Sequence, residues 1–146
     1  MRISGGCLCG AVRFEARPGL EFQLQCYKCY CTDCRKSSGS GHSALLGMPR
    51  EAVSIDGTVR EFRSKADSGR GVTRAFCPAC GCGVYSHNEI MPGTLFLRAS
   101  VLDDPSIFAT QVAVYTSRAP AWDPASPEVM SFPEMPSAPP SSGACR

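Results

Sequence analysis

The sequence predicts a mainly β, single domain of 146 residues with little helix. Three observations support this fold class. Apolar and polar residues alternate over several short stretches. Glycine, proline and small polar residues interrupt the chain at short intervals. Seven of the ten cysteines lie in three clusters that could fasten loops together. A chain of this length can bury roughly two-thirds of its unfolded surface in one core.

The strand candidates follow in chain order. Period-two alternation predicts strands near 12–16, 53–55, 95–99 and 112–114. Turn-forming residues at 37–42, 56–57, 67–71 and 92–93 separate them. Asp56-Gly57 favours a hairpin turn between two strands. At 102–108 we expect one short helical turn, capped by Asp103 or Asp104 and beginning at Pro105.

We expect one zinc-binding domain over residues 1–125 and an irregular Pro- and Ser-rich tail over 126–146. Trp122 would anchor this tail to the core, and Cys145 would be an exposed free thiol.

Bulk properties argue against some functions. The net charge of +2 does not indicate a protein that binds nucleic acid or another polyanion. The start of the sequence lacks the apolar stretch of a signal peptide, and no apolar run has membrane-spanning length. We therefore expect a cytoplasmic protein in a reducing compartment. Clustered cysteines there bind metal or do redox work more often than they form disulfides.

The first and third clusters together make a complete zinc site. Cys7 and Cys9 form C-x-C, and Cys77 and Cys80 form C-P-x-C-G. These four thiolates would complete a tetrahedral zinc shell, which is typical of a structural site. The alternative is a pair of disulfides that joins the two motifs.

The middle cluster supplies three thiolates. Cys29, Cys31 and Cys34 form C-x-C-x-x-C, so a zinc there would keep one position open, as catalytic zinc sites do. We predict a loop after it, in which Arg35 and Lys36 meet carboxylates while Ser37 and Ser38 donate hydrogen bonds. This pattern favours a pocket for a small anionic thiol, whose sulfur would take the vacant position.

The sequence leaves alternatives open at this second site. A fourth ligand could close it, and the candidates are Cys26, Cys82, His42 and Asp33. His42 could instead carry protons for a reaction, or be an ordinary hydrogen-bonded histidine.

Several ordered motifs over about residues 3–125 resemble the glutathione-dependent formaldehyde-activating (GFA) family, which includes the centromere protein V group. They are G-G-C-x-C-G-A-V-R-F-E at 5–15, the C-x-C-x-x-C-R-K-S-S-G-S block at 29–40, and F-C-P-x-C-G at 76–81. The resemblance implies an Mss4-like β fold with two zincs per chain. By motif match, one zinc is structural, on Cys7, Cys9, Cys77 and Cys80. The other is catalytic, on Cys29, Cys31 and Cys34.

The implied activity is that of a carbon–sulfur lyase, which joins glutathione to formaldehyde as S-(hydroxymethyl)glutathione or releases it. Two departures leave the thiol and the aldehyde undefined. Cys34 is followed by Arg-Lys-Ser where the glutathione enzymes have Trp-Lys-Pro, and Tyr30 replaces a common histidine.

The expected partner is thus a small-molecule thiol such as glutathione, with no nucleic acid and no membrane. The oligomeric state is undefined. The alternative functions are a zinc-stabilised thiol carrier without turnover and a protein-interaction module.

Overall fold

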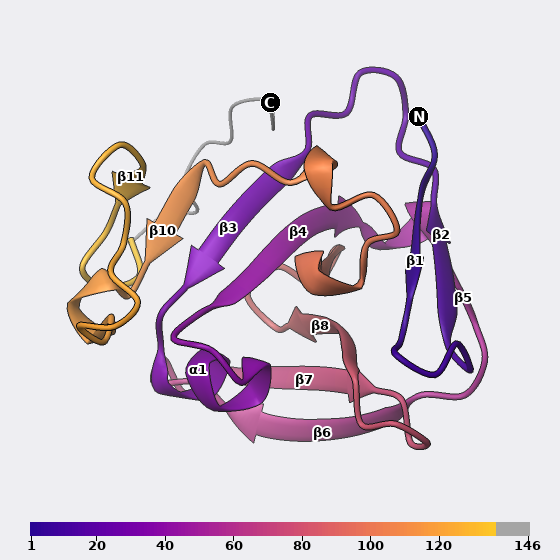
Figure 1. The fold of residues 1–146 in the computed structure, drawn as a ribbon, viewed down its shortest axis with the longest axis horizontal. Helices are drawn as coiled ribbons and strands as arrows, with labels where there is room; N and C mark the ends of the chain where they lie inside the picture. The colour runs from indigo at the N-terminus through magenta and orange to yellow at the C-terminus, as the bar shows by residue number, and fades with distance from the viewer. Residues whose placement is uncertain (137–146) are drawn as a thin grey trace. The chain divides into compact units, whose positions relative to one another are not determined.

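The computed structural model describes residues 1–136 and is mainly β, as the sequence predicts (Figure 1). The residues it describes form eleven strands, one α-helix and four single-turn 3₁₀ helices. The chain divides into two compact units. The first contains Met1–Phe22 and Gly47–Ser106, and the second contains Gln23–Leu46 and the chain from Ile107 onward.

The first unit contains two antiparallel strand arrangements. Strand β2 (Arg13–Ala16) lies between β1 (Ile3–Gly6) and β5 (Val53–Asp56). The other arrangement has the order β9-β8-β7-β6, where β6 is Arg60–Lys65, β7 Gly71–Phe76, β8 Gly83–Asn88 and β9 Thr94–Arg98. The 3₁₀ turns of this part of the chain are Arg50–Ala52, Ala99–Val101 and Pro105–Ile107.

The predicted alternation explains β2 directly. Phe14 and Ala16 are buried, whereas Arg13 is exposed. The alternation at 95–99 is only half right, because Phe96 and Arg98 on the other face of β9 are buried as well. A strand buried on both faces carries no period-two signal in its burial.

The turn at Asp56-Gly57 is real, but its prediction as a hairpin is wrong. Gly57 has a φ of 99°, which supplies the turn. However, β5 pairs with β2, in the register Phe14↔Ile55, while β6 pairs with β7. The dipeptide therefore takes the chain from one strand arrangement to the other.

An ion pair ties β2 to the segment after β9. Both terminal guanidinium nitrogens of Arg13, Nη1 and Nη2, donate to the Asp103 carboxylate, and the Nη1–Oδ1 distance is 3.0 Å. Ser4 Oγ donates to Asp103 Oδ2 at 2.8 Å. These hydrogen bonds, of which the one from Arg13 has the larger effect, lower the pKa of the Asp103 carboxyl group to about 2. Asp104 is the cap of the following helical turn, as predicted, because its carboxylate accepts from the Ser106 amide at 3.0 Å.

The second unit is organised around β10 (Val112–Val114), which runs parallel to both β3 (Gln25–Cys29) and β11 (Met130–Ser131). Strand β4 (Ser43–Pro49) neighbours β3 and leads the chain into the first unit. Helix α1 (Thr32–Ser38) connects β3 to β4, and a 3₁₀ turn at Thr116–Arg118 follows β10.

Regular structure continues past residue 125. Strand β11 lies in the segment expected to be an irregular tail, and the Phe132 amide donates to the Ala113 carbonyl at 2.9 Å. The domain boundary at 125 stays a prediction, and Cys145 lies outside the described residues. Trp122 is 69% exposed, so it does not serve as the expected buried anchor. None of the helices in residues 1–136 is long and apolar enough to cross a membrane.

Gly5 in β1 is a sensitive test of the first unit's packing. A Cβ at this position would lie 2.1 Å from the Val101 carbonyl oxygen and 2.6 Å from the Phe14 ring. We expect Gly5→Ala to lower the free energy of unfolding by about 2 kcal/mol, within the range of overpacking mutations. Urea denaturation measures this change.

The control is Gly19→Ala, because a Cβ there meets no atom within 4 Å. Equal stability of the two variants would contradict the close approach at Gly5.

Candidate metal centres

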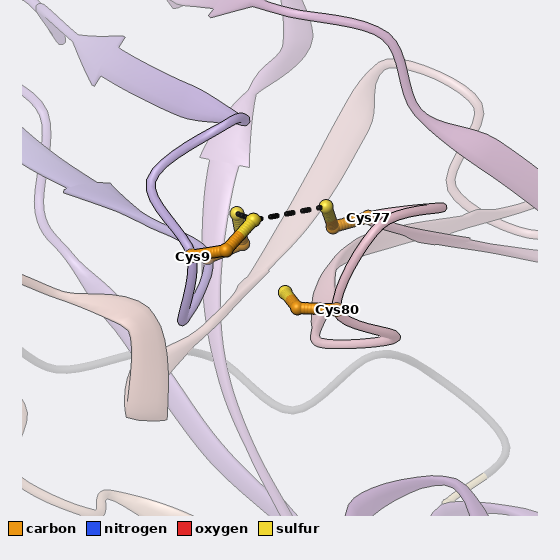
Figure 2. A group of neighbouring side chains, drawn as sticks. Cys9, Cys77 and Cys80 are labelled. Atoms are coloured by element: carbon orange, nitrogen blue, oxygen red, sulfur yellow. Dashed lines mark hydrogen bonds between the residues drawn. The ribbon is translucent and has the colours of Figure 1, made fainter.

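The first candidate centre is a cluster of four cysteines in the first unit. Cys7 and Cys9 come from the loop after β1, and Cys77 and Cys80 come from the turn between β7 and β8. Their sulfurs all lie within 4.8 Å of one another. Figure 2 shows the side chain of Cys9 directed toward those of Cys77 and Cys80 across the gap between the two loops.

Two tight turns build this cluster. The Gly81 amide donates to the Cys77 carbonyl at 2.8 Å, and Gly81 has a φ of 75°, which glycine adopts without strain. On the other side, the Cys7 amide donates to the Val12 carbonyl at 2.9 Å, while the Val12 amide donates to the Cys7 sulfur at 3.2 Å. Backbone amides directed at sulfur stabilise the thiolate form.

The thiols of this cluster do not titrate independently. Burial raises the pKa of Cys7, but the Val12 amide and the neighbouring thiols outweigh it and lower the pKa to about 6. The Ala11 amide lowers the pKa of Cys9, yet Cys7, burial and the other thiols raise it to about 11. One thiolate thus opposes formation of the next. A bound cation would remove this conflict, because it stabilises all of the thiolates.

The sulfur spacing fits zinc. The Cys7–Cys9 and Cys9–Cys77 sulfur separations are both 3.7 Å. Tetrahedral coordination with Zn–S bonds of about 2.3 Å requires sulfurs ~3.8 Å apart. The four cysteines are free thiols, and their separations are far beyond the ~2.05 Å of a disulfide bond. The disulfide alternative is therefore not what the structure contains.

The second candidate centre is a cluster of three cysteines in the second unit. The sulfurs of Cys29, Cys31 and Cys34 also lie within 4.8 Å of one another. Cys29 ends β3, and Cys34 lies in α1; both are buried, whereas Cys31 is partly exposed. Among residues 1–136, no further histidine, cysteine or carboxylate completes this group.

Helix α1 builds the three-cysteine cluster. It begins at Thr32 because Cys31 is its N-cap: the Cys31 sulfur accepts from the Cys34 amide at 3.3 Å. It ends at Gly39, whose φ of 76° is the left-handed C-cap conformation. The prediction of a loop for residues 35–38 is therefore wrong. A helix of seven residues is too short to show a 3.6-residue repeat.

The three thiols also oppose each other's ionisation. Hydrogen bonding to Cys31 and Cys34, then burial, raises the pKa of Cys29 far above its ordinary value. For Cys31, the hydrogen bond to Cys29 lowers the pKa, but Cys34 and burial outweigh it and the net shift is upward. A zinc ion fits this donor set, because thiolates are among its preferred ligands and a cation offsets their repulsion.

The fourth-ligand candidates differ in their surroundings. Cys26 is fully buried and disulfide-bonded, so its sulfur is not a free thiolate. Cys82 belongs to the first unit, where its thiol donates to the Gly83 carbonyl. His42 and Asp33 lie outside the group of three sulfurs.

The predicted substrate-binding residues all lie on α1. Arg35 and Lys36 occupy its last turn, where Arg35 is partly exposed and Lys36 is exposed. The Ser37 hydroxyl donates to the Cys34 carbonyl at 3.4 Å, and the Ser38 hydroxyl donates to the Arg35 carbonyl at 3.2 Å. Both hydroxyl protons are thus engaged within the helix, and the role of these serines toward a substrate stays a prediction.

The structure adds one residue that the sequence did not indicate. Asp123 Oδ2 lies 2.5 Å from His42 Nδ1 and accepts a long hydrogen bond of 3.4 Å from Ser40 Oγ. The pair is 81 residues apart in the chain, and Asp123 belongs to no local motif. No sequence signal could have joined them.

Comparison with known proteins identifies the family of the chain. Residues 2–118 match the family model of the glutathione-dependent formaldehyde-activating enzyme. The chain belongs to this family. A Halomonas elongata protein, whose name assigns it provisionally to the glutathione-dependent formaldehyde-activating enzymes, is 29% identical over 108 residues. That match covers 70% of this chain and 67% of the relative.

A solved structure has a similar fold. The crystal structure of a Rhodobacter sphaeroides protein, a structural genomics target, matches with a TM-score of 0.55. It covers 68% of this chain and 87% of its own, at 18% identity. This likeness concerns the fold alone.

The four-cysteine cluster gives a prediction about folding. We expect Cys77→Ser to remove one zinc per chain. An average substitution lowers the free energy of unfolding by about 1 kcal/mol, and we expect a much larger loss here because metal binding and folding are coupled. Metal analysis and thermal unfolding measure both effects.

Cys82→Ser is the matched control, since Cys82 lies in the same turn but outside the cluster. If Cys82→Ser costs as much metal and stability as Cys77→Ser, the ligand set is wrong.

Proposed function

We propose that this chain binds a small thiol such as glutathione at a zinc held by Cys29, Cys31 and Cys34, and adds that thiol to an aldehyde such as formaldehyde. The reverse reaction, release of the aldehyde, is that of a carbon–sulfur lyase. One observation carries the proposal: a chain with a four-sulfur cluster also has a cluster of only three sulfurs. Family membership and the name of the Halomonas elongata relative support the substrates.

The two zincs would have different roles. Four thiolates leave no ligand position for a substrate, so the zinc on Cys7, Cys9, Cys77 and Cys80 would be structural. A zinc on three thiolates, when bound, would favour the thiolate form of an incoming thiol, which is the nucleophile.

The chain's own residues would bind and orient the thiol compound. Arg35 and Lys36 place two positive charges directly after Cys34 in α1. Glutathione carries two carboxylates, which arginine and lysine bind through charge-assisted hydrogen bonds. Arg35 and Lys36 would thereby give affinity and orientation, while Ser37 and Ser38 would need to release their helix carbonyls before donating to a ligand. We place the reaction in the cytoplasm, where such thiols stay reduced.

A second candidate is a thiol carrier without turnover. It uses the same open centre and is favoured by the intrinsic ease of thiol addition to formaldehyde, which needs little rate enhancement. A protein-interaction module, by contrast, would need both centres closed.

The zinc environment tests the proposal directly. We expect two zincs per chain with an average of about 3.5 sulfurs per zinc, rising to about 4 when glutathione binds. X-ray absorption at the zinc edge measures this number. An average of 4 that glutathione does not change would instead indicate two closed centres.

Cys31→Ser should separate the two zinc roles. We expect it to abolish the glutathione-dependent change and turnover while the fold persists, because only the local cluster in 29–34 is altered. Circular dichroism and exchange NMR with ¹³C-formaldehyde are the measurements. A loss of stability as large as that of Cys77→Ser would contradict the division of roles.

A further inference from the structure

A histidine–carboxylate pair lies in the second unit, which also contains the three-cysteine cluster. His42 Nδ1 and Asp123 Oδ2 are 2.5 Å apart, and the two side chains are only 19% and 20% exposed. A pair this sheltered is more than a chance surface contact, because solvent competes weakly with its hydrogen bond.

The backbone at Gly41 leaves room for the Asp123 carboxylate. A Cβ on Gly41 would lie 2.4 Å from Asp123 Oδ2 and 2.6 Å from its Cβ, so only glycine allows Asp123 this approach. The Asp123 amide in turn donates to the Pro120 carbonyl at 2.9 Å, which fixes the turn that presents the carboxylate. The segment 37–42, which the sequence predicts as a break between strands, therefore also accommodates the Asp123 side chain at Gly41.

Two contacts hold the pair close to the three-cysteine cluster. The His42 ring packs on Tyr30, with 5.2 Å between ring centroids, and Tyr30 lies between Cys29 and Cys31 in the chain. The next residue, Ser43, is buried and donates its hydroxyl to the Cys34 carbonyl at 2.9 Å. His42 is therefore held between two connections to the cluster.

The carboxylate sets the tautomer of the ring. An ionised aspartate only accepts hydrogen bonds, so His42 Nδ1 must carry the hydrogen. In the neutral ring this leaves the lone pair on Nε2, on the side away from Asp123. The same arrangement orients the base in hydrolytic triads.

Resting on the function proposed above, we infer that His42 is the proton-transfer group of the three-cysteine centre and that Asp123 is its positioning residue. The thiol S–H bond breaks, and its proton goes to His42 Nε2. The sulfur electron pair forms the S–C bond, and the C=O π pair moves to the aldehyde oxygen. His42 Nε2 then returns its proton to that oxygen, so the step balances without an oxidant or reductant.

The rival explanation is that the pair only holds two loops together. His42→Asn separates these roles. The Asn amide nitrogen can replace Nδ1 as the donor to Asp123, but the side chain has no proton acceptor of suitable basicity. A purely structural role would survive this substitution, whereas proton transfer would not.

The kinetic experiment uses zinc-loaded protein, glutathione and ¹³C-formaldehyde, with exchange NMR to measure turnover. We expect His42→Asn and Asp123→Asn to lower kcat by about 10²-fold, the low end of the usual contribution of acid–base catalysis, with little change in KM for glutathione. Added imidazole should restore part of the turnover of His42→Ala. His87→Gln, on β8 of the first unit, is the control and should behave as wild type.

A second measurement does not depend on turnover. The chain has only two histidines, so ¹⁵N–¹H spectra of the rings can be assigned with the His87→Gln variant. We expect the Nδ1–H tautomer for His42 in the wild type and a loss of that preference in Asp123→Asn. Zinc content should stay at two per chain in Asp123→Asn and in His42→Asn, and the second result would exclude His42 as a required zinc ligand.

The outcomes separate the two proposals. If wild type and His42→Asn accelerate the reaction equally, the proton-transfer role is overturned and the proposed function stands. If the wild type with two zincs gives no acceleration, the proposed function fails, and proton transfer with it. An Nε2–H tautomer would overturn the role of Asp123 whatever the turnover.

Discussion

The central physical constraint in this protein is the mutual repulsion of clustered thiolates. Seven cysteine sulfurs lie in two groups, each within 4.8 Å, and in both groups the ionisation of one thiol opposes that of another. A bound cation would supply the missing positive charge. Without it, the loop after β1 and the turn between β7 and β8 would bring together thiols that oppose one another's ionisation.

This constraint explains why the local backbone is built as it is. Amides of Ala11 and Val12 in one loop, and of Cys82 in the other, lower the pKa of the sulfurs they face. In the second unit, the Cys34 amide does the same for Cys31 as the first bond of α1. The tight turns are therefore part of the metal centres, since they direct N–H groups at sulfur.

Local sequence could predict the parts of the structure that local chemistry controls. Alternation identified β2, and the cysteine spacing identified both clusters, because a C-x-x-C motif places its sulfurs on one turn whatever the rest of the chain does. Strand pairing was harder. Asp56-Gly57 makes a turn, but β5 pairs with β2 and not with β6, and β2 lies far from β5 in the sequence. Helix α1 was missed because a cysteine sulfur caps it, where a hydroxyl or carboxylate would be the usual signal.

The position of Asp123 could not be predicted from local sequence. Its contact with His42 depends on the turn at Pro120 and on the bare backbone of Gly41, and neither leaves a recognisable pattern 81 residues away. When a site combines a local motif with one distant residue, the sequence predicts the motif but not the distant residue.

The two clusters also differ in how far along the chain they reach, and this difference gives an independent reason for two roles. Cys9 and Cys77 are 68 residues apart, whereas the three-cysteine cluster lies within 29–34. Closing the longer loop restricts the unfolded chain more, by roughly 2 kcal/mol on the logarithmic dependence of loop-closure entropy. A metal at the four-cysteine cluster would therefore stabilise the fold more than a metal at the three-cysteine cluster. A metal at the local cluster would contribute less to folding, so an open or exchanging ligand position there would cost little stability.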